Sequence, residues 1–227
     1  MKVRSIYVAG ATLGLTVLGT VLTSTANAAT VFTANLTQDQ EPPPAGTSPP
    51  LTSTGDPRPL SFGTATFVLN DAQTQLSMDA TVFNIDVTGT QTPDTFDNLV
   101  AAHIHVYPFP PPSPLPPTAP VRWGFFGTPD NDNNPDQLVV TPFAAGLVGG
   151  TFSSIWDLPE GNAGTTLTTN LPGIFAGLSY INFHTVQFGG GEIRGQIVPG
   201  PIAGAGLPAL LAFGGFMWAR RRKAAAA

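Results

Sequence analysis

"SYINFHTVQFGGGEIRGQIV", residues 179–198, contains two segments in which apolar and polar residues alternate, separated by three glycines. The apolar positions are Ile181, Phe183, Ile193 and Ile197. The polar positions are Tyr180, Asn182, His184, Glu192, Arg194 and Gln196. Because successive side chains of a strand point to opposite faces, this alternation predicts two β-strands, each with one apolar and one polar face.

Similar runs, rich in Val, Ile, Phe and Thr and bounded by Gly, Pro, Asn or Asp, recur through the middle of the chain. Such runs are typical of strands. We therefore expect strands at 31–36, 62–69, 75–85, 98–106, 137–141, 150–156, 179–186 and 192–198. A short helix is expected near 171–177. The close spacing of short strands predicts an all-β fold, an antiparallel sandwich or barrel.

The N-terminal segment has the features of a secretory signal peptide, which we assign to residues 1–28. Lys2 and Arg4 precede an apolar run at 6–22, and the tripeptide at 26–28 has the small-x-small pattern of a cleavage site. The protein is therefore expected to be exported.

The C-terminal segment, residues 199–227, combines an apolar stretch at 202–219 with a basic cluster at 220–223. The stretch is long enough to cross a bilayer as a transmembrane helix, with the basic cluster on the inner side. The segment resembles the PEP-CTERM sorting tails of bacterial proteins, which an exosortase reads, although Pro-Gly-Pro at 199–201 replaces the usual Pro-Glu-Pro. A plain single-pass anchor is the alternative.

The segment between these ends, residues 29–198, is long enough for one domain with a hydrophobic core. It holds all 14 acidic residues of the chain and only three basic ones, Arg58, Arg122 and Arg194, so its formal net charge is −11. Nucleic acids and anionic lipids are therefore poor partners for it. The chain has no cysteine, so disulfides cannot stabilise the fold.

Two proline-rich stretches, 41–59 and 108–120, interrupt the strand pattern, and the second has eight prolines in thirteen positions. Proline fixes φ and cannot donate to a strand ladder, so the second stretch is expected to be a stiff loop directly after the strand at 98–106. The alternative is a polyproline ligand for a partner protein.

The three histidines of the chain lie on two predicted strands. His103 and His105 share a face because they are two residues apart, and His184 lies on the polar face of its own strand. If these faces meet, the histidines form one polar cluster with Glu192 and Arg194.

The pieces "AAHIHV" at 101–106 and "YINFHTVQFGGGEIRGQI" at 180–197 resemble the CHRD domain, first described in chordin and widespread in bacterial exported proteins. This resemblance covers roughly residues 30–198. It implies an extracellular, Ig-like β-sandwich or barrel without established enzymatic activity. The chain departs from the common pattern after His105, where the long proline loop replaces a short turn.

Three interpretations of the cluster follow. The five residues can form a hydrogen-bonded network, with Glu192 and Arg194 as a pair, that fixes strand register. Alternatively, His103, His105 and His184 supply three imidazoles with an open position, which suits copper or zinc and resembles copper binding in Cu/Zn superoxide dismutases, themselves β-sandwiches. In the third interpretation Glu192 is the base of a hydrolase, although no paired carboxylate or serine nucleophile motif accompanies it.

A second candidate site is the segment "TPDNDNNPDQL" at 128–138, which offers several oxygen ligands suited to calcium. These are Asp130, Asp132, Asn133, Asn134 and Asp136. Their spacing differs from that of an EF-hand, and the same residue types are common in turns.

Together these features predict an exported, non-enzymatic binding or structural module at the cell surface or in the extracellular matrix. Its expected partners are an exosortase-type enzyme and a protein or polysaccharide ligand, and it is attached to the membrane before processing. The alternative is a copper- or zinc-binding protein with redox activity.

Overall fold

The computed structural model describes residues 29–133 and 138–200. The strands are β1 (Thr30–Thr37), β2 (Phe62–Leu69), β3 (Gln75–Phe83), β4 (Leu99–Val106), β5 (Val121–Gly127), β6 (Val139–Pro142), β7 (Gly149–Asp157), β8 (Ser179–Thr185) and β9 (Ile193–Pro199). The helix α1 (Leu167–Phe175) precedes β8, and two 3-10 turns, Gln38–Gln40 and Ala45–Thr47, follow β1.

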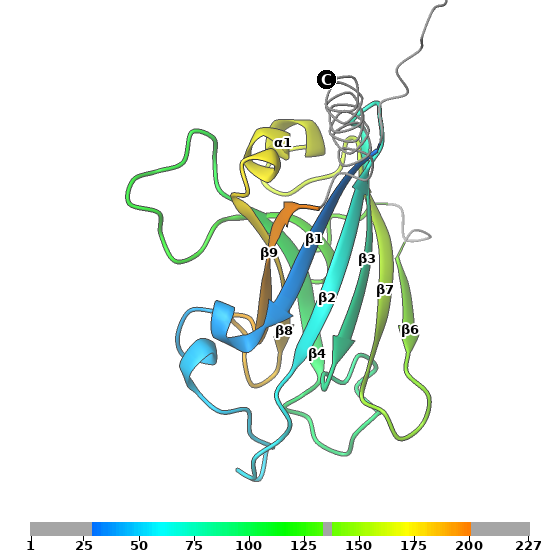
Figure 1. Ribbon diagram of the computed structural model, residues 1–227. Coiled ribbons are helices and arrows are strands. Elements are labelled where there is room, and N and C mark those ends of the chain that lie inside the picture. Colours follow the sequence, from blue (N-terminus) through cyan, green and yellow to red (C-terminus); the bar gives the residue numbers. More distant parts are fainter. Residues whose placement is uncertain (1–28, 134–137, 201–227) are drawn as a thin grey trace, which may run out of the picture.

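All nine strands form one antiparallel sheet in the order β5-β4-β8-β9-β1-β2-β3-β7-β6. The sheet curls into a half-barrel, with β1, β2, β3 and β7 in front of β4 and β8 in Figure 1. The two sides of the curled sheet pack together in the interior, where Trp123 of β5 stacks on Trp156 of β7 with ring centroids 5.7 Å apart. The predicted all-β fold is confirmed, but hydrogen bonding runs through a single sheet instead of two separate ones.

The hydrophobic core is formed by strand residues that alternate between buried and exposed positions. In β2 every second residue is buried, and Phe67 and Leu69 point into the same interior as Phe32 of β1. In contrast, all seven residues of β8 are buried, so both faces of this strand are covered. The inner face packs on the core through Ile181 and Phe183.

The proline-rich loops cover the outer face of β8. Backbone and side-chain contacts fix the 108–120 loop there, because the Ala119 N–H donates to the hydroxyl of Tyr180 and Arg194 donates to the carbonyl of Pro117. The rest of this loop projects from the domain as the long green excursion in Figure 1. Polar side chains on the outer face of β4 and β8 are consequently shielded from water.

The structure differs from the sequence prediction in two elements. The strand β5 was not expected, and α1 begins at Leu167, four residues before the expected helix, behind a capping box formed by Thr166 and Thr169. The expected signal peptide at 1–28 and membrane helix at 202–219 lie outside the described residues. No helix among residues 29–133 and 138–200 is long and apolar enough to cross a membrane.

Candidate metal centre

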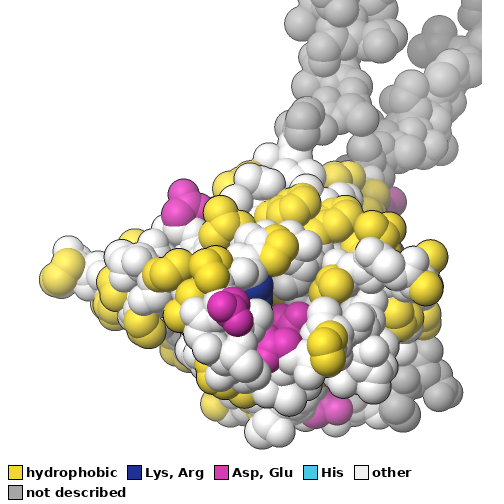
Figure 2. Space-filling view, turned by 90° about the horizontal axis from the view of Figure 1, so that it is seen from below, with side chains coloured by type: hydrophobic (Ala, Val, Ile, Leu, Met, Phe, Trp, Pro, Cys, Tyr) yellow, Lys and Arg dark blue, Asp and Glu magenta, His cyan; other side chains and the backbone are white. Residues whose placement is uncertain are grey.

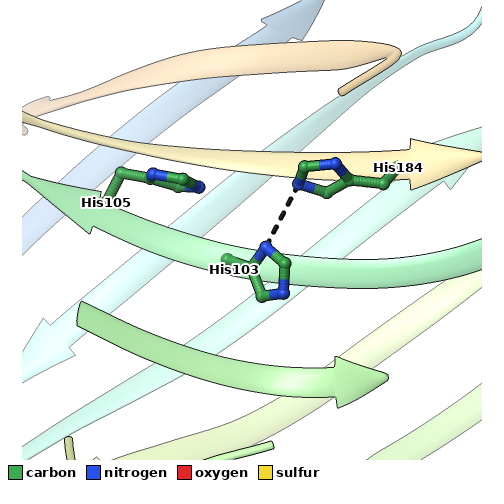
Figure 3. Close-up of side chains that lie close together, drawn as sticks. All are labelled: His103, His105 and His184. Atoms are coloured by element: carbon green, nitrogen blue, oxygen red, sulfur yellow. Dashed lines mark hydrogen bonds between the residues drawn. The ribbon is translucent and has the colours of Figure 1, made fainter. Parts of the chain in front are cut away.

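Three histidine side chains converge on the outer face of the sheet. His103 and His105 come from β4 and His184 from the neighbouring β8 (Figure 3). They are 4%, 8% and 8% exposed, and one nitrogen of each ring lies within 4.8 Å of the other two. The closest pair, His103 Nδ1 and His184 Nε2, is 3.1 Å apart. The predicted meeting of these two polar faces is thus present in the structure.

A backbone carbonyl contacts the outward nitrogen of each ring. His103 Nε2 lies 3.0 Å from Thr128 O, His105 Nδ1 lies 2.7 Å from Ala119 O, and His184 Nδ1 lies 2.9 Å from Gly189 O. A carbonyl oxygen can only accept, so each of these nitrogens carries the hydrogen. In a neutral ring the other nitrogen then carries a lone pair.

The tautomers so fixed leave three lone pairs facing one another. His103 Nδ1 and His184 Nε2 confront each other without a proton between them, and His105 Nε2 is buried without a hydrogen-bond partner among the described residues. A buried polar atom left unpaired costs about 1–3 kcal/mol. A cation at the centre would satisfy all three nitrogens at once.

Burial also keeps the three rings neutral. Burial, together with the nearby His184, lowers the pKa of His103 to about 4. Burial likewise lowers the pKa of His105 to about 4, and it lowers the pKa of His184. At neutral pH the cluster therefore presents unprotonated imidazoles, the form that binds a metal.

The geometry is close to that of a three-histidine metal centre. Nitrogens at ~2.0–2.1 Å from a tetrahedral zinc ion lie about 3.3 Å from one another. The His103–His184 pair already has this spacing, whereas the wider spread of 4.8 Å within the cluster requires small ring rotations. Carbonyls that orient the ligand imidazoles are the usual second layer of such centres.

Arg194 approaches the cluster indirectly. Its guanidinium lies 3.4 Å from the ring centroid of Tyr180, which stacks on His105 at 4.6 Å with an interplanar angle of 9°. Burial raises the pKa of Tyr180 to about 12, so the phenol stays protonated. Arg194 is therefore the outer layer of a stack that holds His105 in place.

Glu192 lies in a different cluster, so the predicted pairing of Glu192 with Arg194 is wrong. Arg58, from the first proline-rich loop, donates to both carboxylate oxygens of Glu192 at 2.8 and 2.5 Å. Thr185, which precedes the glycine turn, donates to the same carboxylate at 2.6 Å. Figure 2, the view of the domain from below, shows acidic and basic side chains but no histidine.

The expected calcium segment is described only in part. Asp130 and Asp132 are visible, and the Ser154 hydroxyl donates to Asp132 at 2.7 Å, while Asn134 and Asp136 lie outside the described residues. Asn133 donates its backbone N–H to the buried Glu160 at 2.8 Å. The calcium site stays a prediction.

Sequence reasoning did not assign a role to two groups beside the histidines. Asn182 was expected on the polar face of β8, and its amide nitrogen contacts Glu41 Oε1 at 3.2 Å. Glu41 is buried and comes from a loop without periodicity, so no sequence signal placed it there. The pKa of Glu41 is raised to about 7 by burial.

Comparison with protein families gave one match, to the CHRD domain, over residues 32–197. This range lies within the predicted domain at 29–198 and includes all three histidines. Comparisons with curated proteins and with solved structures gave no significant match.

Proposed function

The chain belongs to the CHRD domain family, and from this premise we propose that it is an exported binding module whose β domain holds a copper or zinc ion between His103, His105 and His184. The family supports a binding or structural role. The metal is the ligand for which the described residues offer a specific site.

One observation carries the proposal. The carbonyls of Thr128, Ala119 and Gly189 each accept from one imidazole, which turns the three remaining ring nitrogens into lone-pair donors directed at one another. A purely structural network would place a hydrogen between neighbouring nitrogens. Neutral nitrogen donors favour copper or zinc over calcium and magnesium, which prefer oxygen ligands.

The metal proposal is tested by titrating the mature chain with Zn²⁺ and Cu²⁺ at pH 7 and measuring bound metal after desalting. We expect one ion per chain, and His184→Ala should abolish this uptake because the site loses one of its three imidazole ligands. Gln75→Ala, on an exposed position of β3, is the control. Equal uptake by the His184 variant, or none by the native chain, would contradict the proposal.

Export is the second part of the proposal, and it rests on the two ends of the sequence. The signal-peptide pattern at 1–28 predicts a mature chain beginning near Ala29, and the PEP-CTERM-like tail predicts cleavage by an exosortase-type enzyme near Gly200. Before processing, the apolar stretch at 202–219 would hold the chain in the membrane, and afterwards the module would meet protein or polysaccharide ligands at the cell surface.

The intact mass of protein purified from native cells tests this part. The expected mass corresponds to a chain that begins near Ala29 and ends near Gly200. A mass that includes the basic cluster at 220–223 would instead indicate a plain membrane anchor, and one that includes residues 1–28 would contradict export through signal cleavage.

A further inference from the structure

Three histidines would leave a tetrahedral metal ion with one open position, and Asn182 is on the same face of the sheet as their side chains. This residue is opposite His103 in the β4–β8 register and two residues before His184, so its side chain shares their face. Asn182 is 2% exposed. Its Oδ1 is buried without a hydrogen-bond partner among residues 29–133 and 138–200. An acceptor in this position is suited to a ligand that brings its own hydrogen.

Glu41 determines which way the amide of Asn182 faces. Its Oε1 accepts from Asn182 Nδ2 at 3.2 Å, which directs the Oδ1 end away from the carboxylate. Gly191 makes this contact possible. It has φ +122°, and a Cβ there would lie 2.3 Å from Glu41 Oε1 and 2.9 Å from Asn182 Nδ2. The glycine turn, the carboxylate and the amide thus form one tightly packed unit.

A cavity of about 250 Å³ adjoins this unit at Gly191. It is lined by residues 42–45, Thr118 and residues 187–191. The lining segments also carry the histidine partners, because Gly189 accepts from His184 and Thr118 precedes Ala119, which accepts from His105. A small molecule in this cavity would contact the segments that orient His184 and His105.

We propose that the open position of the metal takes a small protic oxygen ligand, such as water, whose O–H donates to Asn182 Oδ1 while its oxygen binds the metal. This inference rests on the proposed metal centre. Asn182 is a positioning residue in this arrangement, and Glu41 holds its amide in the accepting orientation. A ligand without hydrogen, such as azide, leaves Oδ1 unpaired and is disfavoured relative to water.

The inference is tested by titrating the copper-loaded mature chain with azide and following the azide-to-copper charge-transfer absorption. Asn182→Leu removes the acceptor, so water loses a hydrogen bond that azide never had. We expect the azide Kd to fall by about five- to tenfold, the factor that corresponds to one hydrogen bond. An unchanged Kd at full copper content would overturn the inference and leave the metal centre standing.

Two variants of Glu41 provide the matched control and do not alter β8. Glu41→Gln keeps an oxygen that accepts from Asn182 and should leave the azide Kd unchanged, whereas Glu41→Leu frees the amide and should lower the Kd in the same direction as Asn182→Leu. Equal Kd values for the Gln and Leu variants would contradict the role of Glu41. Copper content distinguishes failure of the metal site from failure of the Asn182 contact, because a native chain that takes up no copper overturns the proposed function and this inference together.

Discussion

Three glutamates are buried in this domain, and the surroundings of two of them, Glu192 and Glu41, differ in a way that distinguishes a structural role from a functional one. Glu192 is 0% exposed, and its carboxylate receives two bonds from Arg58, one from Thr185 and one from Ser61. Glu41 is 5% exposed and receives one bond, from the amide of Asn182. Arg58 forms an ion pair with Glu192, which we call the matched glutamate. Glu41, the unmatched glutamate, has no such ion pair among the described residues.

The matched glutamate holds the fold together. Arg58 also donates to Gln187, whose side-chain oxygen accepts from the backbone N–H of Leu51, so the ion pair ties the first proline-rich loop to the glycine turn. The unmatched glutamate lies in a loop and contacts Asn182, which pairs with His103 across β4 and β8. Groups that burial leaves without a partner are characteristic of functional sites, because folding alone gives no reason to keep them.

The largest expected effect comes from breaking the matched pair. Arg58→Ala leaves the Glu192 carboxylate buried without its cation, and we expect the free energy of unfolding to fall by about 3–5 kcal/mol in urea denaturation. Arg194→Ala is the control, and it removes a cation–π contact and one hydrogen bond worth about 1 kcal/mol together. If Arg194→Ala lowers the free energy of unfolding more than Arg58→Ala does, the result would support the pairing of Glu192 with Arg194 that the sequence suggested.

Acid should destabilise the metal-free protein through the histidines beside the unmatched glutamate. The folded-state pKa of His105 is about 4, below the ordinary 6.5, so the unfolded chain binds the proton first. Stability present above pH 6.5 is then lost as the pH falls toward 4, by about 3 kcal/mol for this residue. Urea unfolding midpoints at pH 7, 5.5 and 4 measure this loss of stability. In His105→Leu the midpoint should depend less steeply on pH. An equally steep profile in the variant would mean that other groups cause the acid effect.

Glu41 should show the opposite pH response. Burial raises its pKa to about 7, so the folded state keeps the proton while the unfolded chain releases it near 4.5. Stability present below pH 4.5 is therefore lost as the pH rises through 7, by about 2 kcal/mol because the carboxyl retains some contact with solvent. The native chain should lose this amount relative to Glu41→Gln between pH 5 and 8. If the difference in unfolding free energy between the two proteins does not change with pH, the folded-state pKa of Glu41 is not raised.

The sequence predicted those parts of the structure that depend on local composition and alternation. Eight of the strands follow from runs rich in Val, Ile, Phe and Thr, and the polar faces that carry the three histidines follow from alternation, because successive side chains of a strand point to opposite faces. The strand β5 was not predicted, because Gly124 interrupts it and because its pairing with β4 is irregular, with register shifts. A Cβ at Gly124 would lie 1.8 Å from Pro129 O, so close backbone approach explains the glycine.

Long-range partners in loops could not be predicted. Arg58 and Glu41 both lie in the first proline-rich stretch, which has no period that would assign a side chain to a face. Their partners are more than 130 residues away in the chain. Glu192 precedes β9 instead of lying within it, so the alternation that placed it beside Arg194 does not apply.

The central claim is that three histidine nitrogens are preset as metal ligands, and NMR of the imidazole nitrogens tests it most directly. In the metal-free protein at pH 7 we expect hydrogens on His103 Nε2, His105 Nδ1 and His184 Nδ1. Addition of one equivalent of Zn²⁺ should shift the three opposite nitrogens together and leave the hydrogens in place. A different set of tautomers, or ring signals that do not respond to zinc, would contradict the claim.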